Sequence, residues 1–122
     1  MAHIETNFGV SMLYHRDIGF PKTVALMHGT FKLTYSRHAL ESANNDRYGM
    51  MELPETLTVE GKNAIEILVE NGKAIKSVYR VGYDDELDMV MVVQSDGFVR
   101  TVWFNKKTDK HKTLDHSKYD KP

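Results

Sequence analysis

The chain has 122 residues, 16 basic and 17 acidic side chains, a net charge of −1 and no cysteine. This length favours one domain that buries a sizeable core without help from metals or disulfides. The lack of cysteine excludes a disulfide scaffold, thiolate zinc sites and cysteine nucleophiles, and it fits a reducing compartment. There is no signal-peptide pattern and no apolar run near the roughly 20 residues of a membrane span, so we expect a cytoplasmic protein without a membrane partner.

The charges are distributed unevenly. Acidic residues concentrate between Glu52 and Asp88, whereas residues 106–122 carry six lysines and two histidines against three aspartates. We therefore expect a single domain spanning residues 1–122 that ends in a basic C-terminal tail, 106–122. Such a tail is either a solvated segment or a surface that meets phosphate.

The N-terminal third contains short apolar segments. Residues 8–14 are compatible with an edge strand or an ordered arm, and residues 23–27 with a strand or one helical turn. Phe31, Leu33 and Tyr35 then alternate with polar residues, which is the period of a half-buried strand.

A short helix follows this strand. Ser36 or Thr34 can cap it, and residues 37–43 are good or tolerable helix formers, so the sequence predicts a helix over about 36–46 that ends by Gly49. Its apolar face is narrow, so it depends on packing against the rest of the protein. Beyond Pro54, residues 56–60 form a minor strand or an extended connector.

Residues 64–105 predict a four-stranded antiparallel β-meander. Asn71-Gly72 is typical of a type I′ hairpin turn, and a second tight turn lies at Asp96-Gly97. Between these turns, the carboxylates after Tyr83 favour an exposed loop. The predicted fold class is therefore α+β, with the short helix packed on one face of the meander.

A two-residue loop at Asp96-Gly97 sets the register of the last hairpin and separates its two faces. It pairs Val90 with Trp103, Met91 with Val102 and Val92 with Thr101. One face is apolar and carries Met89, Met91, Val93, Val102 and Phe104. The other is mixed and carries Val90, Val92, Gln94, Thr101 and Trp103, with Asn105 at its end; we expect this face to stay partly open.

Several side chains suit chemistry on RNA. A histidine near a hydroxyl acts as base and then acid, which is what RNA cleavage through its own 2′-hydroxyl requires, and cations stabilise the phosphorane. The predicted catalytic residues are His38, His111, Arg47, Lys106 and Lys107. The predicted substrate-binding residues are Tyr35, Arg100, Thr101, Trp103 and Asn105, among which the single tryptophan either fills core space or stacks on a base.

No cofactor or metal is expected. The segment from His111 to His116 offers imidazoles and a carboxylate, but its spacing matches no named zinc or iron motif and its lysines repel a cation. Phosphate-binding glycine loops, nucleophile elbows and metalloprotease motifs are absent from the sequence.

The order of these residues resembles small bacterial and phage ribonuclease-like domains grouped with the RelE and BrnT toxins and the colicin ribonucleases. Residues 35–39, Tyr-Ser-Arg-His-Ala, resemble the start of the helix in that group, and residues 100–105 with 109–114 resemble its closing strand and tail. The resemblance covers roughly residues 31–114. It implies roles for His38 and, more loosely, for Arg47, Thr101, Trp103 and His111, although Ser42 and Asp46 stand where members commonly carry arginine.

Two functions follow as hypotheses. The first is a small metal-independent endoribonuclease of RelE-like type, with RNA as its partner. The second is a non-catalytic, phage-type binding or inhibitor module that docks on a host protein, a cognate inhibitor or a nucleic acid, because separate acidic and basic segments suit an electrostatic adaptor.

Overall fold

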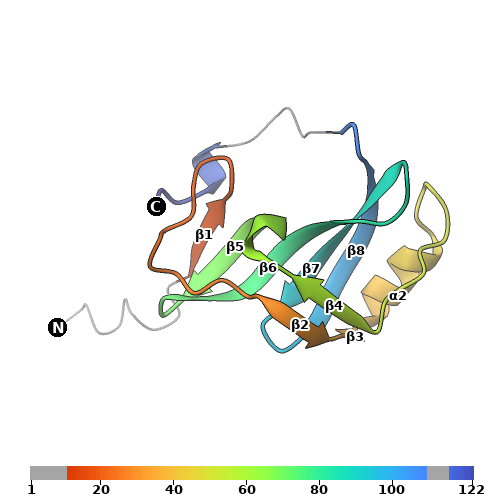
Figure 1. Ribbon diagram of the computed structural model, residues 1–122, viewed down its shortest axis with the longest axis horizontal. Coiled ribbons are helices and arrows are strands. Elements are labelled where there is room, and N and C mark those ends of the chain that lie inside the picture. The colour runs from red at the N-terminus through yellow and green to blue at the C-terminus, as the bar shows by residue number, and fades with distance from the viewer. Residues whose placement is uncertain (1–10, 110–115) are drawn as a thin grey trace.

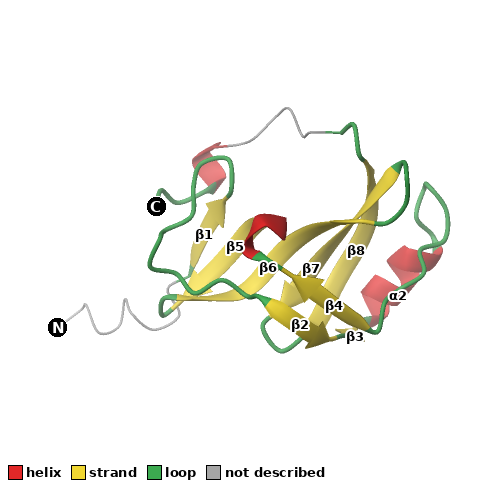
Figure 2. Cartoon of the chain, in the orientation of Figure 1, coloured by secondary structure: helices red, strands yellow, loops and turns green. Residues whose placement is uncertain are grey.

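The structure is a computed structural model that describes residues 11–109 and 116–122. The described residues form one α-helix, eight strands and two short 3₁₀ helices, so the expected α+β class is confirmed (Figure 2). In chain order the elements are β1 (Met12–His15), β2 (Gly29–Lys32), β3 (Thr34–Tyr35), α2 (Arg37–Asn44), β4 (Thr56–Val59), η1 (Gly61–Asn63), β5 (Ala64–Glu70), β6 (Lys73–Gly82), β7 (Leu87–Gln94), β8 (Phe98–Lys106) and η2 (His116–Lys118). None of the helices in the described residues is long and apolar enough to span a membrane.

The main sheet has six strands in the order β1-β5-β6-β7-β8-β3 (Figure 1). The sheet is therefore larger than the expected four strands and is not antiparallel throughout, although its central strands β5, β6, β7 and β8 follow one another and pair antiparallel. Strand β1 adds to β5, and β3 adds to β8 in parallel, which makes the sheet mixed. The strand expected over residues 31–35 is divided, because β2 pairs with β4 in a separate two-stranded sheet while β3 joins the main one.

Tight turns and alternation set the register between neighbouring strands. Asn71 and Gly72 both have positive φ, +52° and +76°, as the type I′ turn requires. The predicted pairs in the last hairpin are confirmed: Val90 with Trp103, Met91 with Val102 and Val92 with Thr101. Nearer the turn the register shifts by one residue, because Val93 pairs with Val99 and the loop has three residues, 95–97, rather than two.

The core lies between one face of the main sheet and the β2–β4 ribbon, which crosses in front of it in Figure 1. The face predicted to be apolar is buried, and its residues join Leu57 and Val59 of β4 in one cluster. The opposite face is less open than expected, since Val90 is fully buried and Asn105 is 4% exposed. Thr101 and Trp103 are half-buried.

Helix α2 lies beside β8 at the end of the sheet. Ser36 caps it: its Oγ accepts a hydrogen bond from the Ala39 N–H at 2.9 Å and donates one to the Arg100 carbonyl at 2.6 Å. Ala39 and Ala43 are buried in the core. A helix therefore occupies the edge of β8 beyond the short β3 pairing.

The last described residues return to the opposite edge of the sheet. The Asp120 N–H donates to the Leu13 carbonyl at 2.7 Å, and the Leu13 N–H donates to the Asp120 carboxylate at 2.8 Å. The Tyr119 hydroxyl donates to Glu66 on β5 at 2.6 Å. This part of the C-terminal segment is thus attached to β1 and β5 rather than extended into solvent.

Candidate functional site

A groove of about 610 Å³ runs between α2 and β8. On the helix side, His38, Glu41, Ser42 and Asn45 line it. These residues stand at helical spacings of three, four and seven, which places them on one side of the helix. A polar stripe therefore forms one wall of the groove, while the adjacent side of α2 is buried.

Strand β8 forms the other wall, with Thr101 and Trp103 among the residues that line it. Both side chains belong to the mixed face of the predicted hairpin, and Trp103 is only half-buried. It is the single tryptophan of the chain. An aromatic ring that is partly exposed in a groove can stack against a planar ligand.

Asp46 joins the two walls at one end. One carboxylate oxygen accepts the Phe104 N–H at 2.9 Å, and the other accepts the Tyr48 N–H at 3.0 Å. The segment after α2 is thereby fixed against β8. These two hydrogen bonds, called the Asp46 clamp below, fix Asp46 and Tyr48. Because Arg47 lies between these two residues, its position along the groove is also restricted.

A cluster of basic and aromatic side chains follows at this end. The Arg47 guanidinium lies 4.7 Å from the centre of the Tyr48 ring, and the Lys106 ammonium lies 5.7 Å from the same centre. Tyr48 is 36% exposed and was not among the predicted site residues. The only sequence signal for it is its place directly after Arg47, which was predicted.

At the other end the groove continues into a second hollow. His38 and Thr101 line both, and the second is completed by Ser36, Phe98 and Arg100. His38 therefore stands where the two hollows meet. The groove therefore has Arg47 and Lys106 at one end and Arg100 at the other, with Trp103 and His38 between them.

The groove also holds two carboxylates, and both have partners. Glu41 lies 3.4 Å from Arg37 one helical turn away, an exposed pair that contributes little to stability. Asp46 accepts the two backbone N–H groups described above. These partners offset part of the negative charge of the groove.

Four of the predicted site residues thus meet in one groove: His38, Arg47, Thr101 and Trp103. Arg100 and Lys106 lie at its two ends. Three others lie elsewhere. Tyr35 donates its hydroxyl hydrogen to the Pro54 carbonyl, and burial raises the pKa of Tyr35 to about 12.

Lys107 and Asn105 are also outside the groove. The Lys107 ammonium lies 2.7 Å from Asp88, which also accepts a 2.8 Å hydrogen bond from Arg80. Burial by itself would raise the pKa of Asp88, but hydrogen bonds from Lys107 and Arg80 outweigh it and hold that pKa below its usual value. Asn105 is buried. His111, the remaining predicted residue, lies outside the described residues.

Among residues 11–109 and 116–122, no three His, Asp or Glu side chains gather closely enough to hold a metal ion. Comparisons of the chain with protein-family models, curated proteins and solved structures give no match. The resemblance to RelE-like and BrnT-like domains accordingly stays a prediction, and the site has to be interpreted from its own chemistry.

Proposed function

We propose that the protein binds single-stranded RNA in the groove between α2 and β8. The observation that carries this proposal is the half-buried Trp103 in a groove whose ends hold Arg47 and Arg100. Unpaired bases stack on aromatic rings, and stacking supplies much of the affinity of proteins for single strands. Cations at both ends of the groove would neutralise phosphates on either side of the stacked base.

The basic and aromatic cluster supports the same proposal. Arginine and lysine side chains around an aromatic ring, as at Arg47, Tyr48 and Lys106, are a common composition for a nucleic-acid surface. The Asp46 clamp holds this cluster beside the groove before any ligand arrives. Less ordering is then required on binding, which favours affinity.

Anisotropy of a labelled single-stranded RNA tests the proposal. Truncating Trp103 to alanine should weaken binding roughly fivefold to a hundredfold, the range for one stacked base. Arg47→Gln should weaken it as well, whereas Lys22→Gln, an exposed cation on another part of the surface, serves as the matched control. Equal affinity of wild type, Trp103→Ala and Arg47→Gln for the RNA would contradict RNA binding in the α2–β8 groove.

A second candidate function is metal-independent cleavage of the bound RNA. His38 favours it, since this imidazole lines both hollows and lies between the tryptophan and Arg100. It would accept the proton of a 2′-hydroxyl and later return one to the leaving oxygen, while Arg100 or Arg47 stabilises the phosphorane. This is the chemistry expected from the sequence, with Lys107 left out because Asp88 holds it elsewhere.

Cleavage is tested on the same RNA in EDTA. We expect His38→Ala to abolish cleavage but to keep most binding, and His28→Ala, an exposed histidine outside the groove, to change neither. His111→Ala examines the other predicted histidine. Intact RNA after incubation with wild type, or equal cleavage by wild type and His38→Ala, would leave binding as the only function of the groove.

A further inference from the structure

We propose that an open hollow beside Tyr83 binds a lysine or arginine side chain from a basic segment of a partner protein. The hollow measures about 460 Å³ and is lined by Glu52, Leu53, Pro54 and Tyr83. It shares no lining residue with the α2–β8 groove. The proposal is therefore independent of RNA binding and adds a protein partner to it.

The Tyr83 ring is held in place by two contacts. Its hydroxyl accepts the Glu52 N–H at 3.0 Å, and its ring meets the Phe104 ring edge to face, with centres 4.7 Å apart. Despite these contacts, Tyr83 is 37% exposed. A fixed aromatic ring that is partly open to solvent can meet a cation without first being ordered.

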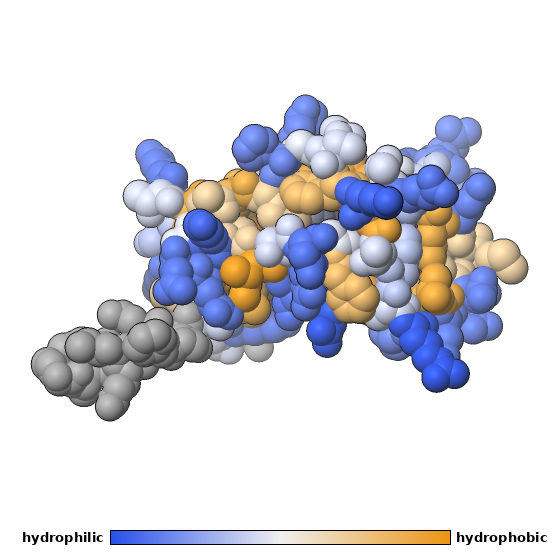
Figure 3. Space-filling view, turned by 90° about the horizontal axis from the view of Figure 1, so that it is seen from below, coloured by the Kyte–Doolittle hydropathy of each residue, from blue (hydrophilic) through white to orange (hydrophobic). Residues whose placement is uncertain are grey.

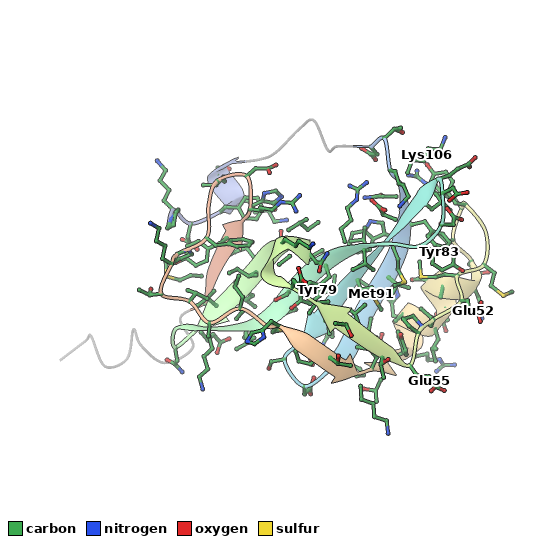
Figure 4. All side chains as sticks on the ribbon, in the orientation of Figure 1. Glu52, Glu55, Tyr79, Tyr83, Met91 and Lys106 are labelled. Atoms are coloured by element: carbon green, nitrogen blue, oxygen red, sulfur yellow. The ribbon has the colours of Figure 1, made fainter. Side chains whose placement is uncertain are left out.

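The rest of the lining suits the stem of a long cationic side chain. Leu53 and Pro54 are partly buried and supply an apolar wall, against which the methylene groups of lysine or arginine pack. Glu52, which lines the same hollow as Tyr83 and is labelled with it in Figure 4, supplies an exposed carboxylate. An apolar wall, an aromatic face and a carboxylate together select a cationic group over a neutral one.

The surrounding charge selects a basic partner segment. Asp84, Asp85 and Glu86 follow Tyr83 in the β6–β7 loop, and all three are exposed. The negative charge of these side chains complements a basic segment and steers its association with the hollow.

An exposed apolar side chain close in sequence to the hollow extends the proposed contact area. Met50 is 73% exposed and lies two residues before Glu52. The space-filling view shows hydrophobic residues at the α2 end of the molecule, set among hydrophilic ones (Figure 3). A basic segment with one or two apolar residues beside its lysine or arginine fits such a surface, and methionine adapts to it.

The experiment is an amide chemical-shift titration of the full chain with two capped peptides, Gly-Leu-Arg-Gly-Leu and the same peptide with neutral citrulline in place of arginine. We expect the arginine peptide to shift the amide signals of Glu52, Leu53 and Tyr83, and citrulline to weaken binding roughly two- to fivefold, the ratio for an exposed cation–π contact. Signals of Thr101 and Trp103 should stay in place. Equal shifts from both peptides, or no shift at the hollow, would overturn the proposal.

Matched variants locate the contact. Tyr83→Leu and Glu52→Gln should each weaken binding of the arginine peptide. Tyr48→Leu and Glu60→Gln, which remove a similarly exposed ring and carboxylate elsewhere, should leave that binding unchanged. If Tyr83→Leu does not fold, Glu52→Gln and the citrulline peptide still decide the question. If raising the protein concentration alone shifts the amide signals of the hollow residues, a second copy of the chain binds there. If RNA shifts them, the ligand is a nucleic acid. Either result would overturn the proposal.

Discussion

Replacing Asp88 by asparagine should lower the free energy of unfolding by about 2 kcal/mol at pH 7. The carboxylate accepts charge-assisted hydrogen bonds from Arg80 at 2.8 Å and Lys107 at 2.7 Å, and its side chain is only 18% exposed. A hydrogen bond to a charged group typically contributes about 1.5–3 kcal/mol, but asparagine keeps one acceptor and Lys107 is partly solvated. A net loss of about 2 kcal/mol, within the range for one such bond, is therefore expected.

The dependence on pH identifies the cause. The pKa of Asp88 is lower in the folded chain than its usual value of 3.8, so its contribution to stability is complete above the unfolded pKa and is lost as the pH falls through the folded one. The difference between wild type and Asp88→Asn should thus be constant from about pH 5 to 7 and should shrink below about pH 4.

Urea denaturation followed by circular dichroism measures this difference at each pH. Asp85→Asn in the neighbouring loop is the matched control, because this carboxylate is exposed and should contribute less than about 0.5 kcal/mol. A cost for Asp88→Asn no larger than that of Asp85→Asn, or a cost that persists unchanged below pH 3, would refute the assignment of Asp88 as an ionic link between Arg80 of β6 and Lys107, the residue after β8.

Two further predictions concern the backbone and a partly buried tyrosine. Gly97→Ala should lower the free energy of unfolding by more than about 2 kcal/mol, and by more than Gly72→Ala does. Both residues have positive φ, but only at Gly97 would the new Cβ come within 2.3 Å of the Lys32 carbonyl oxygen. Equal losses of stability in urea would contradict that close approach. Tyr35→Phe should cost about 1 kcal/mol at pH 7. Because the pKa of Tyr35 is raised to about 12, this stabilisation should be present below about pH 10 and decline at higher pH, which an alkaline denaturation series measures; a cost that grows with pH would count against it.

The parts of the fold predicted from sequence depend on local signals. The Asp96-Gly97 turn carries its own pairing information, so the register of Val90 with Trp103 was predictable. The register shift near Arg100 has no local signal. The parallel pairing of Tyr35 with Val99 was missed as well, because it joins residues far apart in the chain, and nothing in two adjacent residues specifies a partner strand.

The candidate site divides in the same way. His38 was found because it begins a capped helix, and Trp103 because the hairpin register put it on the mixed face. Lys107 was assigned to the site on charge alone, but its partner Asp88 is 19 residues away and visible only once β7 and β8 are side by side. Asp120 was taken as part of a basic tail, whereas its backbone and carboxylate both bind Leu13 at the edge of β1.

Trp103 offers the most direct measurement of the central proposal, since it is the single tryptophan and its fluorescence reports on the groove alone. Titration with a single-stranded RNA should quench this fluorescence, and the binding constant should fall with salt at a slope of about −2 on logarithmic axes, the value for three neutralised phosphates on a single strand. Arg47→Gln should reduce that slope by about 0.7, and Lys22→Gln should not change it. RNA that binds without altering the Trp103 fluorescence, or that does not bind at low salt, would contradict the assignment of the α2–β8 groove as an RNA site.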